Sequence, residues 1–203
     1  TVKAAGKVAV LADAIARDPL KGSCGIAHTR WATHGQPTNE NAHPHHDCRG
    51  GIAVVHNGII ENHESLKKEL IGLGHRFRSE TDTEVLAHLM EEYSAKMPFG
   101  DAFVAALKDV SGTFGIAAVS TTEPRKIYGA RRGSPLVLGL GKNRDEFFLA
   151  SDPAAILSYT RDVMYLDDDE FVILAEDSVE TYSLDRVKKE KKFISRLNEV
   201  IFN

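Results

Sequence analysis

Residues 51–63 read Gly-Ile-Ala-Val-Val-His-Asn-Gly-Ile-Ile-Glu-Asn-His, and this stretch decides how the fold is organised. The apolar run 51–56 predicts a buried strand that ends at Asn57-Gly58. Asn-Gly is a common hairpin turn, but Glu61-Asn62-His63 leads into a helical pattern rather than a returning strand. Alternatively, the Asn57 amide and the Gly58 N–H project together from a strand end, as an oxyanion hole requires. Spacing alone leaves both interpretations open.

Helical and strand patterns cluster separately on either side of this stretch. Helices are predicted over 8–16, around Leu66, Leu70 and Leu73, after a Thr81–Glu84 capping box, and over 102–110. Strands are predicted over 24–28, 114–119, 125–130, 135–140, 146–150, 163–166, 171–175 and 179–182. Asp152 before Pro153 indicates a further helix start. Clustering without strict alternation favours an α+β fold with largely antiparallel sheets.

The composition excludes several classes of protein. Among 203 residues, 25 Lys and Arg face 29 Asp and Glu, and this slightly acidic balance argues against a basic nucleic-acid-binding surface. No apolar run approaches the roughly 20 residues that cross a bilayer, so no membrane partner is expected. Two cysteines, Cys24 and Cys48, make no disulfide framework and fit a reducing, cytoplasmic compartment. The chain opens at Thr1 without a signal pattern, so we expect a processed chain or a fragment.

A long polar loop is predicted over 33–51, and six of the nine histidines fall between His28 and His56. His43, His45, His46 and Cys48 carry donor atoms that zinc prefers. Their spacing matches no recognised ligand pattern, which favours loop histidines bonded to backbone or solvent. No metal is therefore expected.

Arg30 and Asp82 form a third candidate pair. A guanidinium can clamp a carboxylate with two parallel hydrogen bonds, and a carboxylate at a helix start can take an ammonium group. Together they would hold the α-amino-acid end of a small substrate. The alternative is a surface arginine and an aspartate that merely caps its helix.

Six motifs in order carry a resemblance to a known family. They are Thr29-Arg-Trp-Ala-Thr-His-Gly35, Asn41-Ala-His-Pro-His45, Val55-His-Asn-Gly-Ile-Ile-Glu-Asn62, Ser79-Glu-Thr-Asp-Thr-Glu84, Arg132-Gly-Ser-Pro-Leu136 and Leu149-Ala-Ser-Asp152. The chain from Gly6 to about Ala175 resembles the glutaminase domains of class II glutamine amidotransferases, in the form found in glucosamine-6-phosphate synthases. These belong to the N-terminal-nucleophile hydrolase superfamily.

The resemblance implies a role for each matched residue. Arg30 would bind the α-carboxylate of glutamine and Asp82 its α-ammonium group. The loop 31–35 would close over the substrate, with Trp31 shielding the ammonia route and Thr33 and His34 touching glutamine. The oxyanion hole would be formed by Asn57 and Gly58, and His43 would support the loop structure.

The resemblance also implies a four-layer αββα sandwich of antiparallel sheets, here truncated at its N-terminus. Residues 1–184 would form the glutaminase domain, and 185–203 a charged tail, solvated helix or linker towards an absent sugar-isomerase domain. No cofactor is implied. The parent enzyme would be a homodimer that passes ammonia to fructose 6-phosphate and makes glucosamine 6-phosphate.

The nucleophile of the family is an N-terminal cysteine whose own amine acts as the base. Cys24 precedes Gly25 but lies inside the chain, so its amine is locked in a peptide bond. Thr1 falls well after the first strand of the family and is not expected to act as nucleophile. The chain by itself is therefore expected to be inactive. The alternative is a non-catalytic amino-acid-binding or scaffold module derived from the same fold.

Overall fold

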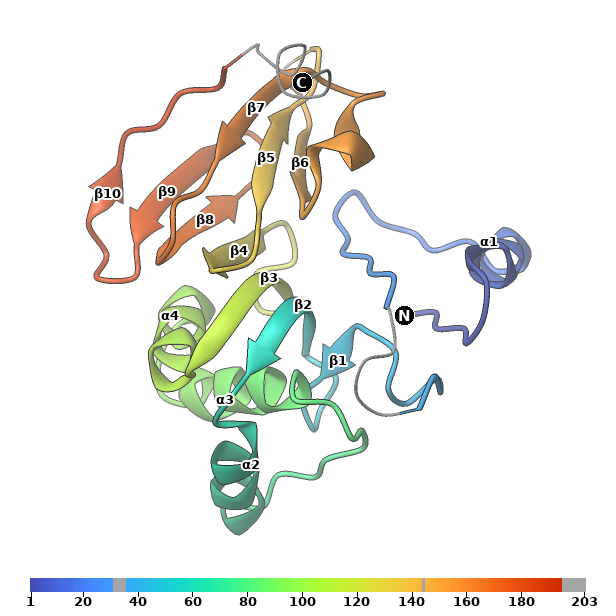
Figure 1. Ribbon diagram of the computed structural model, residues 1–203, viewed down its shortest axis with the longest axis vertical. Helices are drawn as coiled ribbons and strands as arrows, with labels where there is room; N and C mark the ends of the chain where they lie inside the picture. Colours follow the sequence, from blue (N-terminus) through green and yellow to red (C-terminus); the bar gives the residue numbers. More distant parts are fainter. Residues whose placement is uncertain (31–35, 144, 195–203) are drawn as a thin grey trace.

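A computed structural model describes residues 1–30, 36–143 and 145–194, and two antiparallel sheets form its centre (Figure 1). The larger sheet has the order β1-β2-β3-β4-β8-β9-β10 and the smaller one β6-β5-β7. The strands are β1 (His45–His46), β2 (Ile52–Ile60), β3 (Gly112–Ser120), β4 (Ile127–Arg132), β5 (Val137–Leu140), β6 (Phe147–Ala150), β7 (Asp162–Tyr165), β8 (Glu170–Leu174), β9 (Val179–Ser183) and β10 (Lys188–Lys189). The helices are α1 (Val8–Arg17), α2 (His63–Gly72), α3 (Glu84–Ser94), α4 (Phe99–Asp109) and the 3-10 helix η1 (Pro153–Ile156).

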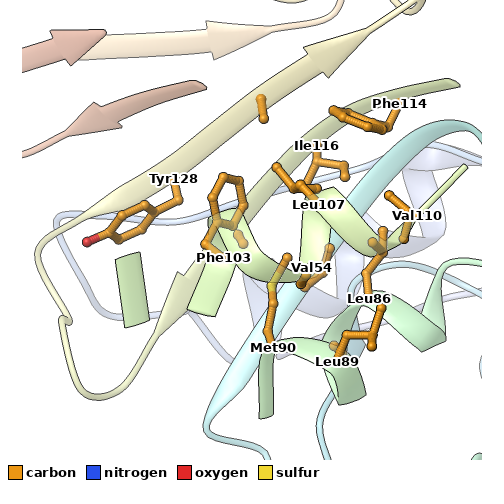
Figure 2. Packing of buried hydrophobic residues seen from close by; sticks show 14 of the residues in the cluster. Val54, Leu86, Leu89, Met90, Phe103, Leu107, Val110, Phe114, Ile116 and Tyr128 are labelled. Carbon is orange, nitrogen blue, oxygen red and sulfur yellow. The ribbon is translucent and has the colours of Figure 1, made fainter. Parts of the chain in front are cut away.

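The main core lies between one face of the larger sheet and helices α3 and α4. Figure 2 shows Met90 and Phe103 of the helices packed against Val54 and Ile116 of the sheet, and all four are buried. Helix α2 joins this core through Leu66 and Leu70. Because fully burying one such side chain contributes about 1.5–3 kcal/mol, this contact fixes α3 against β2.

The smaller sheet covers the opposite face of the larger one. Side chains alternate along β8, so that Phe171 faces the helices while Val172 and Leu174 pack with Leu136 and Leu138. On the outer face of the smaller sheet, Ile156 of η1 packs with neighbouring apolar residues. The expected α+β sandwich of antiparallel sheets is confirmed. Helix α1 stands apart from both sheets in Figure 1 and buries none of its residues.

Most predicted elements form within a few residues of their expected bounds, but several differ. The strand expected over 24–28 is wrong, because no described strand pairs with it. The Thr81–Glu84 capping box is wrong as well: α3 begins only at Glu84, whose carboxylate accepts hydrogen bonds from the Arg78 and Ser79 amides. Asp152 does cap η1, accepting from the Ala154 amide at 2.8 Å.

The lysine-rich tail is not helical over its described part, which ends at residue 194. Lys188 and Lys189 form β10 beside β9. Ile194 then exchanges two backbone hydrogen bonds with Val163, at 2.7 and 3.1 Å. Within the described residues, no helix combines the length and apolarity needed to span a membrane.

Candidate active site

A cavity of about 300 Å³ opens beside β2, and five separate stretches of chain line it: 28–30, His43, 56–59, His63 and 80–83. Among the candidates from the sequence, Arg30, His43, Asn57, Gly58 and Asp82 all lie on its wall. Residues that are up to 52 positions apart in the chain are thus brought to one place. Three further candidates, Trp31, Thr33 and His34, lie outside the described residues.

The cavity exists because β1 is short. Its two residues pair only with Ala53 and Val54, so the following part of β2 has no strand on that side. The amide of His56 donates to His43 Nδ1 at 3.2 Å, and the amide of Ile60 donates to Asp82 Oδ2 at 2.7 Å. Alternate residues of an extended strand present their amides to the same edge. We infer that the Gly58 N–H, midway between these two, faces the cavity edge.

The strand end expected at Asn57-Gly58 is wrong, and, as the flanking residues predicted, the pair forms no hairpin turn. Strand β2 runs through to Ile60 in continuous register with β3, with Asn57 opposite Gly115 and Gly58 opposite Phe114. Gly58 has a φ of 132°, which L side chains rarely adopt, and a Cβ there would overlap the carbonyl oxygen of Thr113. Only glycine therefore allows β2 to pass β3 this closely.

The Asn57 side chain is held by a histidine. His28 Nε2 lies 2.8 Å from Asn57 Oδ1 and donates to it, which leaves the Nδ2 hydrogens as the remaining donors of the amide. His28 itself stacks on His43, with ring centroids 4.2 Å apart. The donor group is therefore oriented by contacts made before any substrate binds.

Burial keeps three histidines at or next to the cavity wall neutral near pH 7: His43, His56 and His45, whose ring packs edge-on against His43. Burial lowers the pKa of His43 to about 2 and that of His45 to about 4, and it also lowers the pKa of His56. Arg30, Asp82 and Glu80 supply a guanidinium and two carboxylates to the cavity wall. A guanidinium and carboxylates around neutral hydrogen-bond donors can receive a small zwitterion.

Neither cysteine lines this cavity. Cys24 lies beside a different hollow, together with Phe147 and Phe148. Cys48 contacts His75 and His88 through its sulfur. The residues that line the cavity can therefore bind a ligand and stabilise an oxyanion, but none of them supplies a thiolate for attack.

The sequence profile of the glutamine amidotransferase domain matches residues 28–158. The chain belongs to this family. A curated glutamine–fructose-6-phosphate aminotransferase (isomerizing) of Methanothermobacter thermautotrophicus is 58% identical over 159 residues, covering 78% of this chain and 27% of the relative. The enzyme of the same name from Methanosarcina mazei is 48% identical over 204 residues, covering 95% of this chain and 32% of the relative. The chain thus spans about a third of these curated relatives.

Among solved structures, the glutamine phosphoribosylpyrophosphate amidotransferase of B. subtilis, complexed with ADP and GMP, superposes with a TM-score of 0.64 at 26% identity. The match covers 77% of this amidotransferase domain and 34% of the B. subtilis chain. Family and fold agree with the resemblance that the six motifs carry.

Sequence reasoning missed several polar residues that complete the wall of the amidotransferase cavity. His28 orients Asn57, and His56 Nδ1 accepts from the Thr83 hydroxyl at 2.9 Å while its Nε2 donates to the Thr113 carbonyl. A signal was available, because His56 directly precedes Asn57 and Thr83 directly follows Asp82. Neighbours of a candidate residue in one motif share its part of the fold.

Proposed function

We propose that the cavity binds glutamine and activates its side-chain amide for hydrolysis. The observation that carries this is the convergence of Arg30, Asp82, Asn57 and Gly58 on one wall. Arg30 binds the α-carboxylate in a bidentate contact, and Asp82 binds the α-ammonium group. Because Asp82 Oδ2 also accepts from the Ile60 amide, its carboxylate is held in place for that contact.

The amide end of glutamine lies at Asn57 and Gly58 in this proposal. Asn57 Nδ2 and the Gly58 N–H donate to the oxygen that becomes negative as the tetrahedral intermediate forms. The attacking group is a cysteine thiolate activated by a free α-amine, as in the family that the motifs resemble. Neither Cys24 nor Cys48 fills that role, since both side chains lie away from the cavity.

We further propose that the released ammonia serves the synthesis of glucosamine 6-phosphate from fructose 6-phosphate, since the curated relatives are named for glutamine and fructose 6-phosphate. On this proposal residues 1–184 are the glutaminase domain and 185–203 lead towards a sugar-isomerase domain of a homodimeric, cytoplasmic enzyme. Trp31, Thr33 and His34 close over the substrate, and His43 supports them.

Calorimetry with glutamine tests the clamp directly. We expect Arg30→Ala to abolish the binding heat, while the control Arg125→Ala leaves it unchanged, because Arg125 pairs with Glu176 on an exposed surface. Two altered ligands separate the ends of the clamp: glutamine methyl ester removes the carboxylate charge, and N-acetylglutamine removes the ammonium charge. Binding that survives both Arg30→Ala and the ester would refute the assignment of Arg30.

A second candidate, an amino-acid-binding module without catalysis, is favoured by the absence of either cysteine from the cavity wall. Both candidates predict glutamine binding, so the chemistry must separate them. The product of the complete gene should release glutamate from glutamine and form glucosamine 6-phosphate from fructose 6-phosphate. Tight glutamine binding without either product would establish the second candidate.

A further inference from the structure

A second cluster of polar side chains gathers against α3, and none of its members lines the glutamine cavity. Cys48 comes from the loop between β1 and β2, His75 from the connection after α2, and His88 and Glu91 from one face of α3 at i, i+3 spacing. Helix α3 packs against both β1 and α2, which brings the three segments together (Figure 1). One donor atom from each of the four residues lies within 4.8 Å of the others.

The separations between these donor atoms are those of a tetrahedral metal site. Cys48 Sγ lies 3.7 Å from His75 Nδ1 and 3.6 Å from His88 Nδ1. Glu91 Oε2 lies 3.0 Å from His75 Nδ1 and 3.4 Å from His88 Nδ1. Zinc bonds of about 2.3 Å to sulfur and about 2.0 Å to nitrogen or oxygen give tetrahedral edges of about 3.6 Å and about 3.3 Å. Four of the six edges thus agree to within about 0.3 Å with those that zinc requires.

The orientation of the two imidazoles points the same way. Each turns Nδ1 into the cluster and Nε2 towards an outer carboxylate, with His75 Nε2 3.5 Å from Glu92 and His88 Nε2 3.6 Å from Glu84. A neutral imidazole has one N–H, and a proton on Nε2 leaves the Nδ1 lone pair facing a sulfur and a carboxylate oxygen. A cation at the centre satisfies all these lone pairs. The carboxylate–histidine–metal arrangement is the usual second shell of zinc.

Backbone amides hold the other two ligands. The Arg76 amide donates to Cys48 Sγ at 3.4 Å, and the Cys48 amide donates to Glu91 Oε2 at 3.0 Å. His88 is fully buried, and the His75 side chain is only 9% exposed. The four donors are therefore positioned by a rigid surrounding rather than gathered on a mobile surface.

We propose that Cys48 Sγ, His75 Nδ1, His88 Nδ1 and Glu91 Oε2 bind one structural zinc ion. A thiolate combined with imidazoles selects zinc over magnesium or calcium, and four protein ligands leave no open position for catalysis. The ion ties the β1–β2 loop and the α2–α3 connection to α3. The loop histidines considered with Cys48 from the sequence are engaged elsewhere: His45 Nε2 bonds Thr81, and His46 Nδ1 bonds the Ile52 carbonyl.

The test measures metal content and then replaces zinc by cobalt. The purified 203-residue chain should retain one zinc per chain after dialysis, and its melting temperature should fall when EDTA removes the metal. The cobalt form should show the visible bands of tetrahedral coordination together with a thiolate-to-cobalt charge-transfer band. Cys48→Ser should remove the charge-transfer band, while the matched control Cys24→Ser should keep it.

A substitution outside the ligand set guards against variants that fail to fold. Glu92→Gln removes the carboxylate behind His75 and should weaken zinc binding by about 10–100-fold. Lys96→Gln, which breaks only the pairing of Lys96 with Glu92, should leave the affinity unchanged. The proposal is overturned if the chain binds no stoichiometric zinc, if cobalt gives no charge-transfer band, or if Glu92→Gln binds zinc as tightly as the parent.

Discussion

Replacing Gly58 by alanine should destabilise the protein by two separable effects. The φ of 132° lies in a region where an L-residue is strained by about 1–3 kcal/mol. In addition, the new Cβ would overlap the Thr113 carbonyl oxygen, and it would lie 2.7 Å from the carbonyl carbon and 3.0 Å from His56 Nε2. Relieving such an overlap by backbone shifts typically costs about 1–3 kcal/mol. The expected loss of unfolding free energy is therefore about 2–6 kcal/mol.

Two other glycines provide the controls. Gly74 has a φ of 99°, but a Cβ there meets nothing within 4 Å, so Gly74→Ala measures strain without overlap. Gly25 has neither a positive φ nor a neighbour within 4 Å, and Gly25→Ala should change stability by less than about 0.5 kcal/mol. Urea titrations with a common m-value give the three free energies. EDTA is included because Gly74 adjoins His75.

The ordering of the three variants decides the outcome. We expect Gly58→Ala to lose the most stability, Gly74→Ala an intermediate amount and Gly25→Ala almost none. Equal losses at Gly58 and Gly74 would refute the close approach of β2 to the Thr113 carbonyl. Gly58→Ala should also abolish glutamine binding measured by calorimetry, because moving β2 away from β3 displaces Asn57 and the Gly58 amide together.

Three further predictions concern charge and chemistry. Acidification from pH 7 to pH 5 should lower the unfolding free energy by about 2 kcal/mol for each of His43 and His45. Their pKa values in the fold are lowered to about 2 and about 4, so only the unfolded chain takes up these protons as the pH falls below about 6.5. Urea titrations at both pH values check this, and the prediction fails if the double variant His43→Gln, His45→Gln loses as much stability on acidification as the parent chain does. Asp82→Asn should weaken glutamine binding about tenfold or more in calorimetry with little change in melting temperature, since the amide oxygen still accepts from Ile60 but the charge is gone. The 203-residue chain should bind glutamine without releasing glutamate in a coupled assay, because neither cysteine lines the cavity, and turnover above the buffer rate would argue against this.

The elements that the sequence predicts well are those whose pattern is local. Helix α4 and strands β3 to β9 carry their own apolar periodicity, and that periodicity also decides which face is buried. The segment 24–28 has an apolar composition but no partner strand among the described residues, and a strand is defined by pairing rather than by composition. Strand β1 went unrecognised for the opposite reason, since two residues carry no period.

The candidate site divides in the same way. Arg30, Asn57 and Asp82 belong to recognisable motifs, and the structure places all three on one cavity. The cluster around Cys48 could not be found from spacing, because 27 and 40 positions separate Cys48 from its two histidines. The only local hint was the i, i+3 placement of His88 and Glu91 on a helix. Ligand sets assembled across three segments become visible only when tertiary packing is known.

The late start of β1 explains why donors are available at this site, because in this antiparallel pair residues 56–60 of β2 lie opposite the stretch that precedes His45. A longer β1 would pair with the amides of residues 56–60 and extend the ladder through them. Instead, His43 and Asp82 accept from the amides of His56 and Ile60, which satisfies the exposed edge on both sides of Gly58. Among the described residues, this leaves the Gly58 amide as the donor that we infer to face the cavity between these two, where the proposed oxyanion would bind.

Helix α3 connects this edge to the cysteine–histidine cluster through one continuous set of contacts. His88 lies 3.6 Å from Cys48 Sγ through Nδ1 and 3.6 Å from Glu84 through Nε2. Glu84 in turn accepts from the Ser79 amide and hydroxyl, each at 2.7 Å, and Ser79 begins the segment that carries Asp82. Burial raises the pKa of Glu84, but its polar contacts with His88, Ser79 and the Arg78 amide outweigh burial and lower the pKa to about 2, so the carboxylate stays charged in both contacts. On this proposal, filling the zinc site holds the start of α3 and, through Glu84 and Ser79, the preceding segment that carries Asp82 on the cavity wall.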